Sequence, residues 1–179
     1  VGSLALESTT TGISNTAVGG QALQGNTTGD YNVAVGVNAL DKNTTADNNT
    51  GIGAGALAAN TTGASNSAVG TDSLGANTTG ASNVAVGATA LDANTTASHG
   101  TAIGFQALSA NTTGAQNTSV GDRSSITNTT GAENTVVGSL AFYTNTTGAQ
   151  NVAIGVSALQ ANTTASFNTA VGYAALTTS

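Results

Sequence analysis

The chain contains no Cys, Pro, Met or Trp, and its aromatic residues are limited to three Phe and three Tyr. Without Cys, a disulfide framework and a metal site built from thiolates are both excluded. With so few large side chains, a deep globular core of the usual kind is also excluded. We therefore expect the small residues of this 179-residue chain to pack in thin layers.

Charge is scarce as well. Only 6% of the residues are charged, and eight acidic residues against two basic ones give a net charge of -6. So few cations form no basic patch that could release counterions, so a nucleic-acid partner is not expected. The chain has no apolar run of about 18 residues, so membrane insertion is not expected. Because it opens and closes within a repeat, we interpret 1–179 as one uncapped repeat array from a longer fibre.

The chain is a tandem repeat throughout. A Val-Gly or Ile-Gly pair recurs every 17 residues, ending at Gly2, Gly19, Gly36, Gly53, Gly70, Gly87, Gly104, Gly121, Gly138, Gly155 and Gly172. Such strict spacing is typical of units that stack on one another. Seventeen residues are too few for a helix, a strand and two turns, and the Gly, Thr and Asn content disfavours helix. The sequence predicts an all-β fold, a parallel β-solenoid of about eleven 17-residue coils with two or three short strands in each.

Aligned positions of the repeat form columns along the predicted rod. The Val or Ile before each Gly, from Val1 to Val171, is always β-branched, which is typical of a buried strand residue. We expect this column to point inward, together with the Leu column that contains Leu91. The Ala column that contains Ala85 lies on the opposite face of the same strand. It is expected either to contact another chain or to pack closely within one roll.

Gly marks the expected corners, because it adopts positive φ without steric cost. One corner is at the Gly87 column and the other at the Gly80 column. Ala46, Ala97 and Ala165 replace Gly in the second column, so that corner is not expected to need positive φ.

An Asn column is expected to form a ladder of side-chain amides along the rod, as stacked Asn residues do in cross-β structures. Gly100 alone interrupts it. The column consists of Asn15, Asn32, Asn49, Asn66, Asn83, Asn117, Asn134, Asn151 and Asn168.

Two coils depart from the core pattern. Ser124 and Ser125 replace the usual Ala-Leu pair, and Phe142 replaces Leu in the next coil. A large residue next to small ones predicts local compensation of core volume.

The repeat Asn-Thr-Ala-Val-Gly-x-x-Ala-Leu-x-x-Asn-Thr-Thr-Gly occurs at 15–29, with a close variant at 151–165. It resembles the repeats of bacteriophage tail-fibre proteins. More distantly, it is similar to the head repeats of trimeric autotransporter adhesins, in which an Asn-Ser-Val-Ala-Ile-Gly core recurs with a shorter period. The resemblance covers the whole chain. It implies a left-handed parallel β-roll, a homotrimer wound about a shared axis, an extracellular location on a virion or bacterial surface, and a binding or spacer role.

No catalytic or cofactor-binding group is predicted. The charged residues and His99 occupy variable positions, which is typical of a solvated surface on a constant scaffold. Asp30 and Asp47 occupy the same position in adjacent coils, so they would stand about 5 Å apart. They are a weak candidate pair for a shared cation or for acid/base chemistry, with a solvated pair of carboxylates as the simpler interpretation.

These observations predict a structural extracellular fibre segment that provides reach and attachment to a surface. The expected partners are other copies of the chain, as a homotrimer or filament, and a cell-surface glycan or protein receptor. Three alternatives remain open: a self-polymerising cell-surface filament, an ice-binding solenoid using the paired Thr columns that contain Thr27 and Thr28, and a polysaccharide-degrading tail spike.

Overall fold

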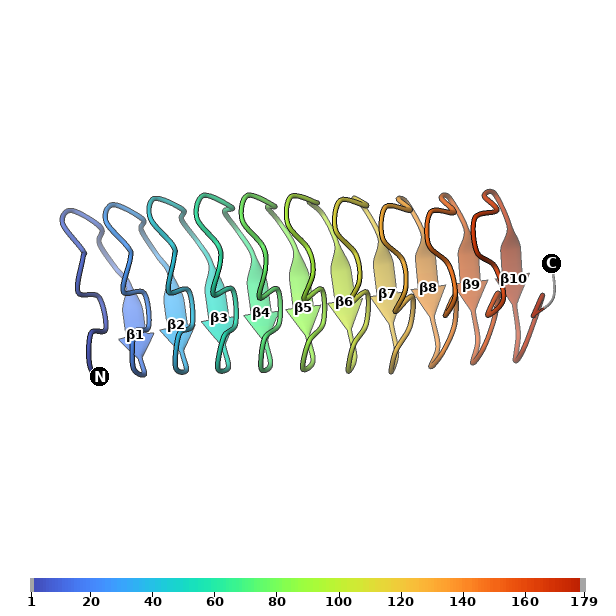
Figure 1. Cartoon of the computed structure of the whole chain (residues 1–179), viewed down its shortest axis with the longest axis horizontal. Helices are drawn as coiled ribbons and strands as arrows, with labels where there is room; N and C mark the ends of the chain where they lie inside the picture. Colours follow the sequence, from blue (N-terminus) through green and yellow to red (C-terminus); the bar gives the residue numbers. More distant parts are fainter. Residues whose placement is uncertain (1, 178–179) are drawn as a thin grey trace.

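A computed structural model describes residues 2–177, in which the chain forms one row of stacked coils (Figure 1). Each coil contributes one three-residue strand. The strands are β1 (Thr16–Val18), β2 (Val33–Val35), β3 (Thr50–Ile52), β4 (Ser67–Val69), β5 (Val84–Val86), β6 (Thr101–Ile103), β7 (Thr118–Val120), β8 (Thr135–Val137), β9 (Val152–Ile154) and β10 (Thr169–Val171).

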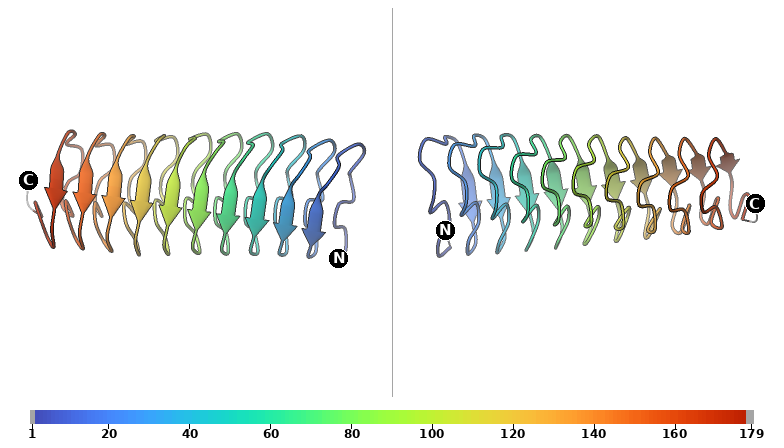
Figure 2. Two further views of the ribbon diagram at one scale, coloured as in Figure 1. Left: turned by 180° about the vertical axis from the view of Figure 1, so that it is seen from behind. Right: turned by 45° about the horizontal axis from the view of Figure 1, so that its top comes forward.

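All ten strands form one parallel sheet, in the order of the sequence. Each residue pairs with its equivalent in the next coil, as Ala85 pairs with Ala102. Figure 2 shows the strands side by side with a common direction from both viewpoints. The predicted all-β parallel solenoid is confirmed, and nine turns separate β1 from β10.

The expectation of two or three strands in each coil was wrong. Beyond its single strand, each coil is a series of turns whose backbone groups still bond to the next coil, as Leu91 N–H does to the Ala107 carbonyl at 3.0 Å. Three non-glycine residues of a typical coil have positive φ, for example Ser82 (58°), Thr89 (54°) and Leu91 (51°). These left-handed residues turn the chain too often for a second strand to form.

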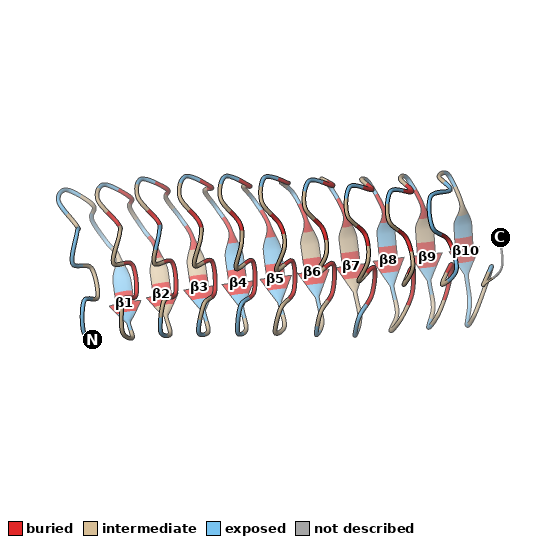
Figure 3. Ribbon diagram, in the orientation of Figure 1, coloured by how far each residue is buried: buried red, intermediate tan, exposed pale blue. Residues whose placement is uncertain are grey.

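The core is narrow and consists of the Ala column of the strands together with the Ala-Leu pair that follows each strand. Figure 3 shows the middle of each strand as buried. The Leu column is therefore inside, as predicted. The Ala column also packs within one roll, and the alternative that it contacts another chain is wrong.

The prediction that the Val/Ile column is buried was also wrong. Ile52 and Val86 are 39% and 38% exposed, and Val171 is 67% exposed. The reason is lack of space between the strand and the Leu side chains. At Gly51, in the Ala column, an added Cβ would already lie 3.1 Å from the Ala56 carbonyl oxygen and 3.4 Å from Leu40 Cγ. Only a small residue fits there, so the bulkier neighbours face outward. Val1 lies outside the described residues.

Of the two predicted corners, only the first has positive φ. Gly87 has a φ of 135°, and its equivalents in other coils have similar values. No residue of the Gly80 column has positive φ among those described, in agreement with the presence of Ala46, Ala97 and Ala165.

Candidate functional site

The predicted Asn column is buried from Asn32 to Asn151 and bonds along the rod. Asn83 is representative. Its N–H donates to Asn66 Oδ1 at 3.0 Å, and its side-chain Nδ2 donates to the Ala97 carbonyl at 2.9 Å. Its own Oδ1 accepts the Gly100 N–H at 2.8 Å. The ladder therefore consists of hydrogen bonds between Asn side chains and backbone groups of adjacent coils, in addition to bonds between the side-chain amides themselves. Along it lie Asn15, Asn32, Asn49, Asn66, Asn83, Asn117, Asn134, Asn151 and Asn168.

Sequence reasoning missed a second Asn ladder. Asn77 Nδ2 donates to Asn60 Oδ1 at 2.8 Å and to the Gly80 carbonyl at 2.9 Å, and Asn94 Nδ2 continues the series to Asn77 Oδ1. The column is Asn in every copy of the repeat from Asn26 to Asn162, and that regularity was the signal. Its members are Asn26, Asn43, Asn60, Asn77, Asn94, Asn111, Asn128, Asn145 and Asn162, all buried.

The two Thr columns beside this ladder differ from each other. The inner Thr uses its hydroxyl within the rod, since Thr78 Oγ1 donates to the Thr95 carbonyl at 3.0 Å and its equivalents do the same. The outer Thr, such as Thr79, is exposed. An ice-binding surface would need two parallel columns of free Thr hydroxyls. Here only the outer Thr column, which lies at a turn, is exposed.

Asp30 and Asp47 are adjacent in the structure, but each carboxylate bonds to the backbone of the preceding coil. Asp47 Oδ1 accepts the Asp30 N–H at 2.7 Å, and Asp30 Oδ1 accepts the Ile13 N–H at 2.7 Å. Ser98 has the same role, with its Oγ accepting the Ala81 N–H at 3.0 Å. A short side chain with an oxygen acceptor is thus sufficient for the hydrogen bond made at this position of the coil. Neither a bound cation nor a reaction is needed to account for Asp30 and Asp47.

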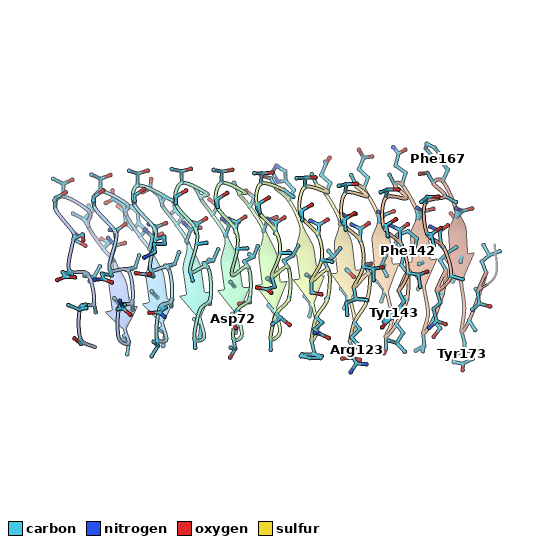
Figure 4. The ribbon with its side chains drawn as sticks, viewed as in Figure 1. Asp72, Arg123, Phe142, Tyr143, Phe167 and Tyr173 are labelled. Carbon is cyan, nitrogen blue, oxygen red and sulfur yellow. The ribbon has the colours of Figure 1, made fainter. Side chains whose placement is uncertain are left out.

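The remaining polar and aromatic groups do not converge. His99 is exposed at a turn. Phe167 and Tyr173 lie on opposite long edges of the rod (Figure 4). Arg123 lies over the Phe105 ring, 5.8 Å from its centroid. Residues 2–177 contain no pocket and no group of three or more potential metal-binding side chains.

Asp92 is a partly buried carboxyl that lies near Asp72. Burial raises the pKa of Asp92 above its ordinary value, and the nearby negative charge of Asp72 raises it further. A raised pKa favours the protonated form in the folded state, so the stability from this group is present in acid and is lost as pH rises through the raised pKa. At neutral pH the ionised Asp92 lowers stability.

We therefore expect Asp92→Asn to raise the melting temperature slightly at pH 7 and to leave it unchanged at pH 3. Thermal unfolding followed by circular dichroism at both pH values measures the difference. An equal shift at the two pH values would show that packing, and not charge, is responsible.

One continuous feature of the surface is an outer sheet face, which we define as the first and third residues of strands β1–β10. Its third-residue column is Val or Ile in every strand, and its first-residue column is Thr, Val or Ser. Neither column contains a charged residue. Beside it, Val37 and Val156 are 55% and 44% exposed. A soluble single chain seldom exposes so long an apolar strip, and such strips usually mark an interaction surface.

Comparison of the chain with models of known families, with curated proteins and with solved structures found no match. Within residues 2–177, no helix is long and apolar enough to cross a membrane.

Proposed function

We propose that the chain is a structural extracellular fibre segment, in which several copies pack through their outer sheet faces into a rod that gives reach and attachment to a surface. One observation carries the proposal: an unbroken 17-residue register produces a long shaft, without a pocket in residues 2–177, whose uncharged outer sheet face runs from β1 to β10.

A second copy of the chain fits this face better than a globular partner. Two rods with the same coil rise match along their full length, and identical faces without charge do not repel each other. Ten strands spaced by about 4.8 Å, each about 10 Å wide, offer roughly 500 Å² per chain, so a pair buries about 1,000 Å² in total. That area reaches the lower limit for a specific interface, and the flanking Val37 and Val156 extend it.

The resemblance to phage tail fibres and trimeric adhesin heads supports a homotrimer and a location on a virion or bacterial surface. The variable turn positions, which carry exposed aromatic side chains such as Tyr31, are where a glycan or protein receptor would be contacted. The alternative of a polysaccharide-degrading tail spike is less well supported, because Asp30 and Asp47 already accept backbone hydrogen bonds.

The test is a charged substitution of the outer sheet face. The variant Val69→Lys/Val86→Lys/Ile103→Lys places three ammonium groups on adjacent strands, and outward-facing Lys is tolerated in a sheet. We expect it to sediment as a monomer while its circular dichroism keeps the signal of the unmodified chain.

The matched control is Thr62→Lys/Thr79→Lys/Thr96→Lys, which places the same charges at the same coil spacing on exposed turns away from the sheet. It should associate as the unmodified chain does. Association that survives the first variant, or is lost equally in both, would exclude the outer sheet face as the interface.

A further inference from the structure

The apolar core of the rod is interrupted at one place. Its buried residues form one cluster that ends at Leu108 and a second that begins at Val136. Between them lies a coil whose three core positions are Ser119, Ser124 and Ser125, all buried.

The serines satisfy one another but provide no apolar contact. Ser119 Oγ is 2.7 Å from Ser124 Oγ and 3.2 Å from Ser125 Oγ, and the Ser124 hydroxyl donates to the Gly121 carbonyl at 3.0 Å. Hydrogen bonds within one coil do not hold that coil to its neighbours. The coils on either side of this layer therefore lose the stacking of Leu on Leu that stabilises the other boundaries.

A second interruption falls at the same boundary. In the ladder of Asn83, each N–H bonds to the side-chain oxygen of the preceding coil, as Asn134 N–H does to Asn117 Oδ1 at 2.9 Å. Gly100 has no side-chain oxygen, so it cannot accept the N–H of Asn117 in this way. The coil that follows Gly100 and the coil that contains the serines meet between β6 and β7. This boundary lacks the stacking of Leu on Leu and the contact of the Asn83 ladder, and it keeps the second ladder through the bond from Asn128 Nδ2 to Asn111 Oδ1.

From these two independent interruptions we infer that the rod consists of two cooperative units that separate between β6 and β7. The unit with β1–β6 is the larger, and the unit with β7–β10 is the smaller. In a stacked repeat, stability is the sum of contributions from each coil and from each boundary between neighbours. A weak boundary therefore lets the smaller unit open while the larger one stays folded. The inference concerns a single rod and does not depend on the proposed association, which would cover all strands alike.

Native-state hydrogen exchange of the full chain, read by mass spectrometry of peptides, tests this inference. We expect the amides of β8–β10 to exchange as one group, at least about tenfold faster than those of β1–β3. The strands β1–β3 are an internal control, because they lie equally close to an end of the rod. Gradual fraying without a weak boundary would give both ends equal protection.

Two variants restore the missing contacts. Gly100→Asn returns the ladder oxygen. An added Cβ would lie close to Asn83 Oδ1 (3.1 Å) and to Leu91 Cδ1 (3.4 Å), but both atoms are ends of side chains that can shift by a few tenths of an ångström. A second variant returns the regular core by changing Ser119→Ala, Ser124→Ala and Ser125→Leu together with Val136→Ala and Phe142→Leu. We expect Gly100→Asn to reduce the difference in exchange rate several-fold, and the combination to remove it. Equal exchange of β1–β3 and β8–β10 in the unmodified chain, or a difference that Gly100→Asn and the combination leave unchanged, would overturn the inference.

Discussion

Replacing Gly87 with Ala is expected to destabilise the rod by an amount on the order of 3 to 5 kcal/mol, which is large for a single added methyl group. Gly87 has a φ of 135°, a conformation that side chains other than Gly rarely adopt. An added Cβ would also overlap the carbonyl oxygen of Gly104 in the next coil. Neither problem can be relieved locally, because Gly104 is itself held in the stack. Denaturant unfolding followed by circular dichroism measures the loss.

Gly131→Ala is the matched control for Gly87→Ala. An added Cβ at Gly131 would approach the Gly148 carbonyl oxygen just as closely. Its column, however, already contains Ala46, Ala97 and Ala165 and does not have positive φ, so the backbone adjusts there at little cost. Equal losses from the two substitutions would show that crowding alone, and not the backbone conformation of the Gly87 column, limits these positions.

Asn83→Leu is expected to lower the free energy of unfolding by about 1 to 3 kcal/mol, which is the cost of one buried polar group left without a partner. The substitution removes the acceptor of the Gly100 N–H and one of two donors to the Ala97 carbonyl, which keeps the bond from Asn94 Nδ2. Leu is close to Asn in size, so the loss reports mainly on hydrogen bonds. The melting temperature and the denaturant midpoint measure it.

Asp92→Ala serves as the control for Asn83→Leu, because Asp92 is only partly buried and its charge does not stabilise the fold at neutral pH. It should change stability little or raise it slightly. If Asn83→Leu and Asp92→Ala gave equal melting temperatures, the Asn ladder would not be what holds the coils in register.

The sequence predicts the solenoid well because register is visible in it directly. A spacing that never varies leaves stacking of equivalent residues as the simplest arrangement, and the Asn column then falls at one place in every coil. The inward Leu column follows from the same periodicity, and so does the corner at Gly87.

Other features, such as the backbone conformation of the turns and the buried face of the strand, depend on three-dimensional geometry and could not be predicted from the pattern of residue types. Leu91 adopts positive φ, which is unusual for its residue type, because the turn must bring its side chain inward. Burial of the strand was assigned to the wrong face, since β-branched residues suit either face and only the width of the coil excludes Val86 from the interior. The polar layer of Ser119, Ser124 and Ser125 is visible in the sequence as a departure from the repeat. That this layer and the gap at Gly100 fall at the same boundary between coils is seen only in the stacked structure.

The outer sheet face is the centre of the proposed function, and the molar mass of the unmodified chain in solution tests it most directly. Because the resemblance to trimeric fibres implies three copies, we expect light scattering coupled to size exclusion, at micromolar concentration, to give three times the 17.0 kDa of one chain. Twice that mass would indicate a pair joined through the same face. A series of larger masses that grows with concentration would instead indicate a filament built through the same face. A mass of one chain across the micromolar range would contradict the account, because the apolar face would then be stable in water without a second copy.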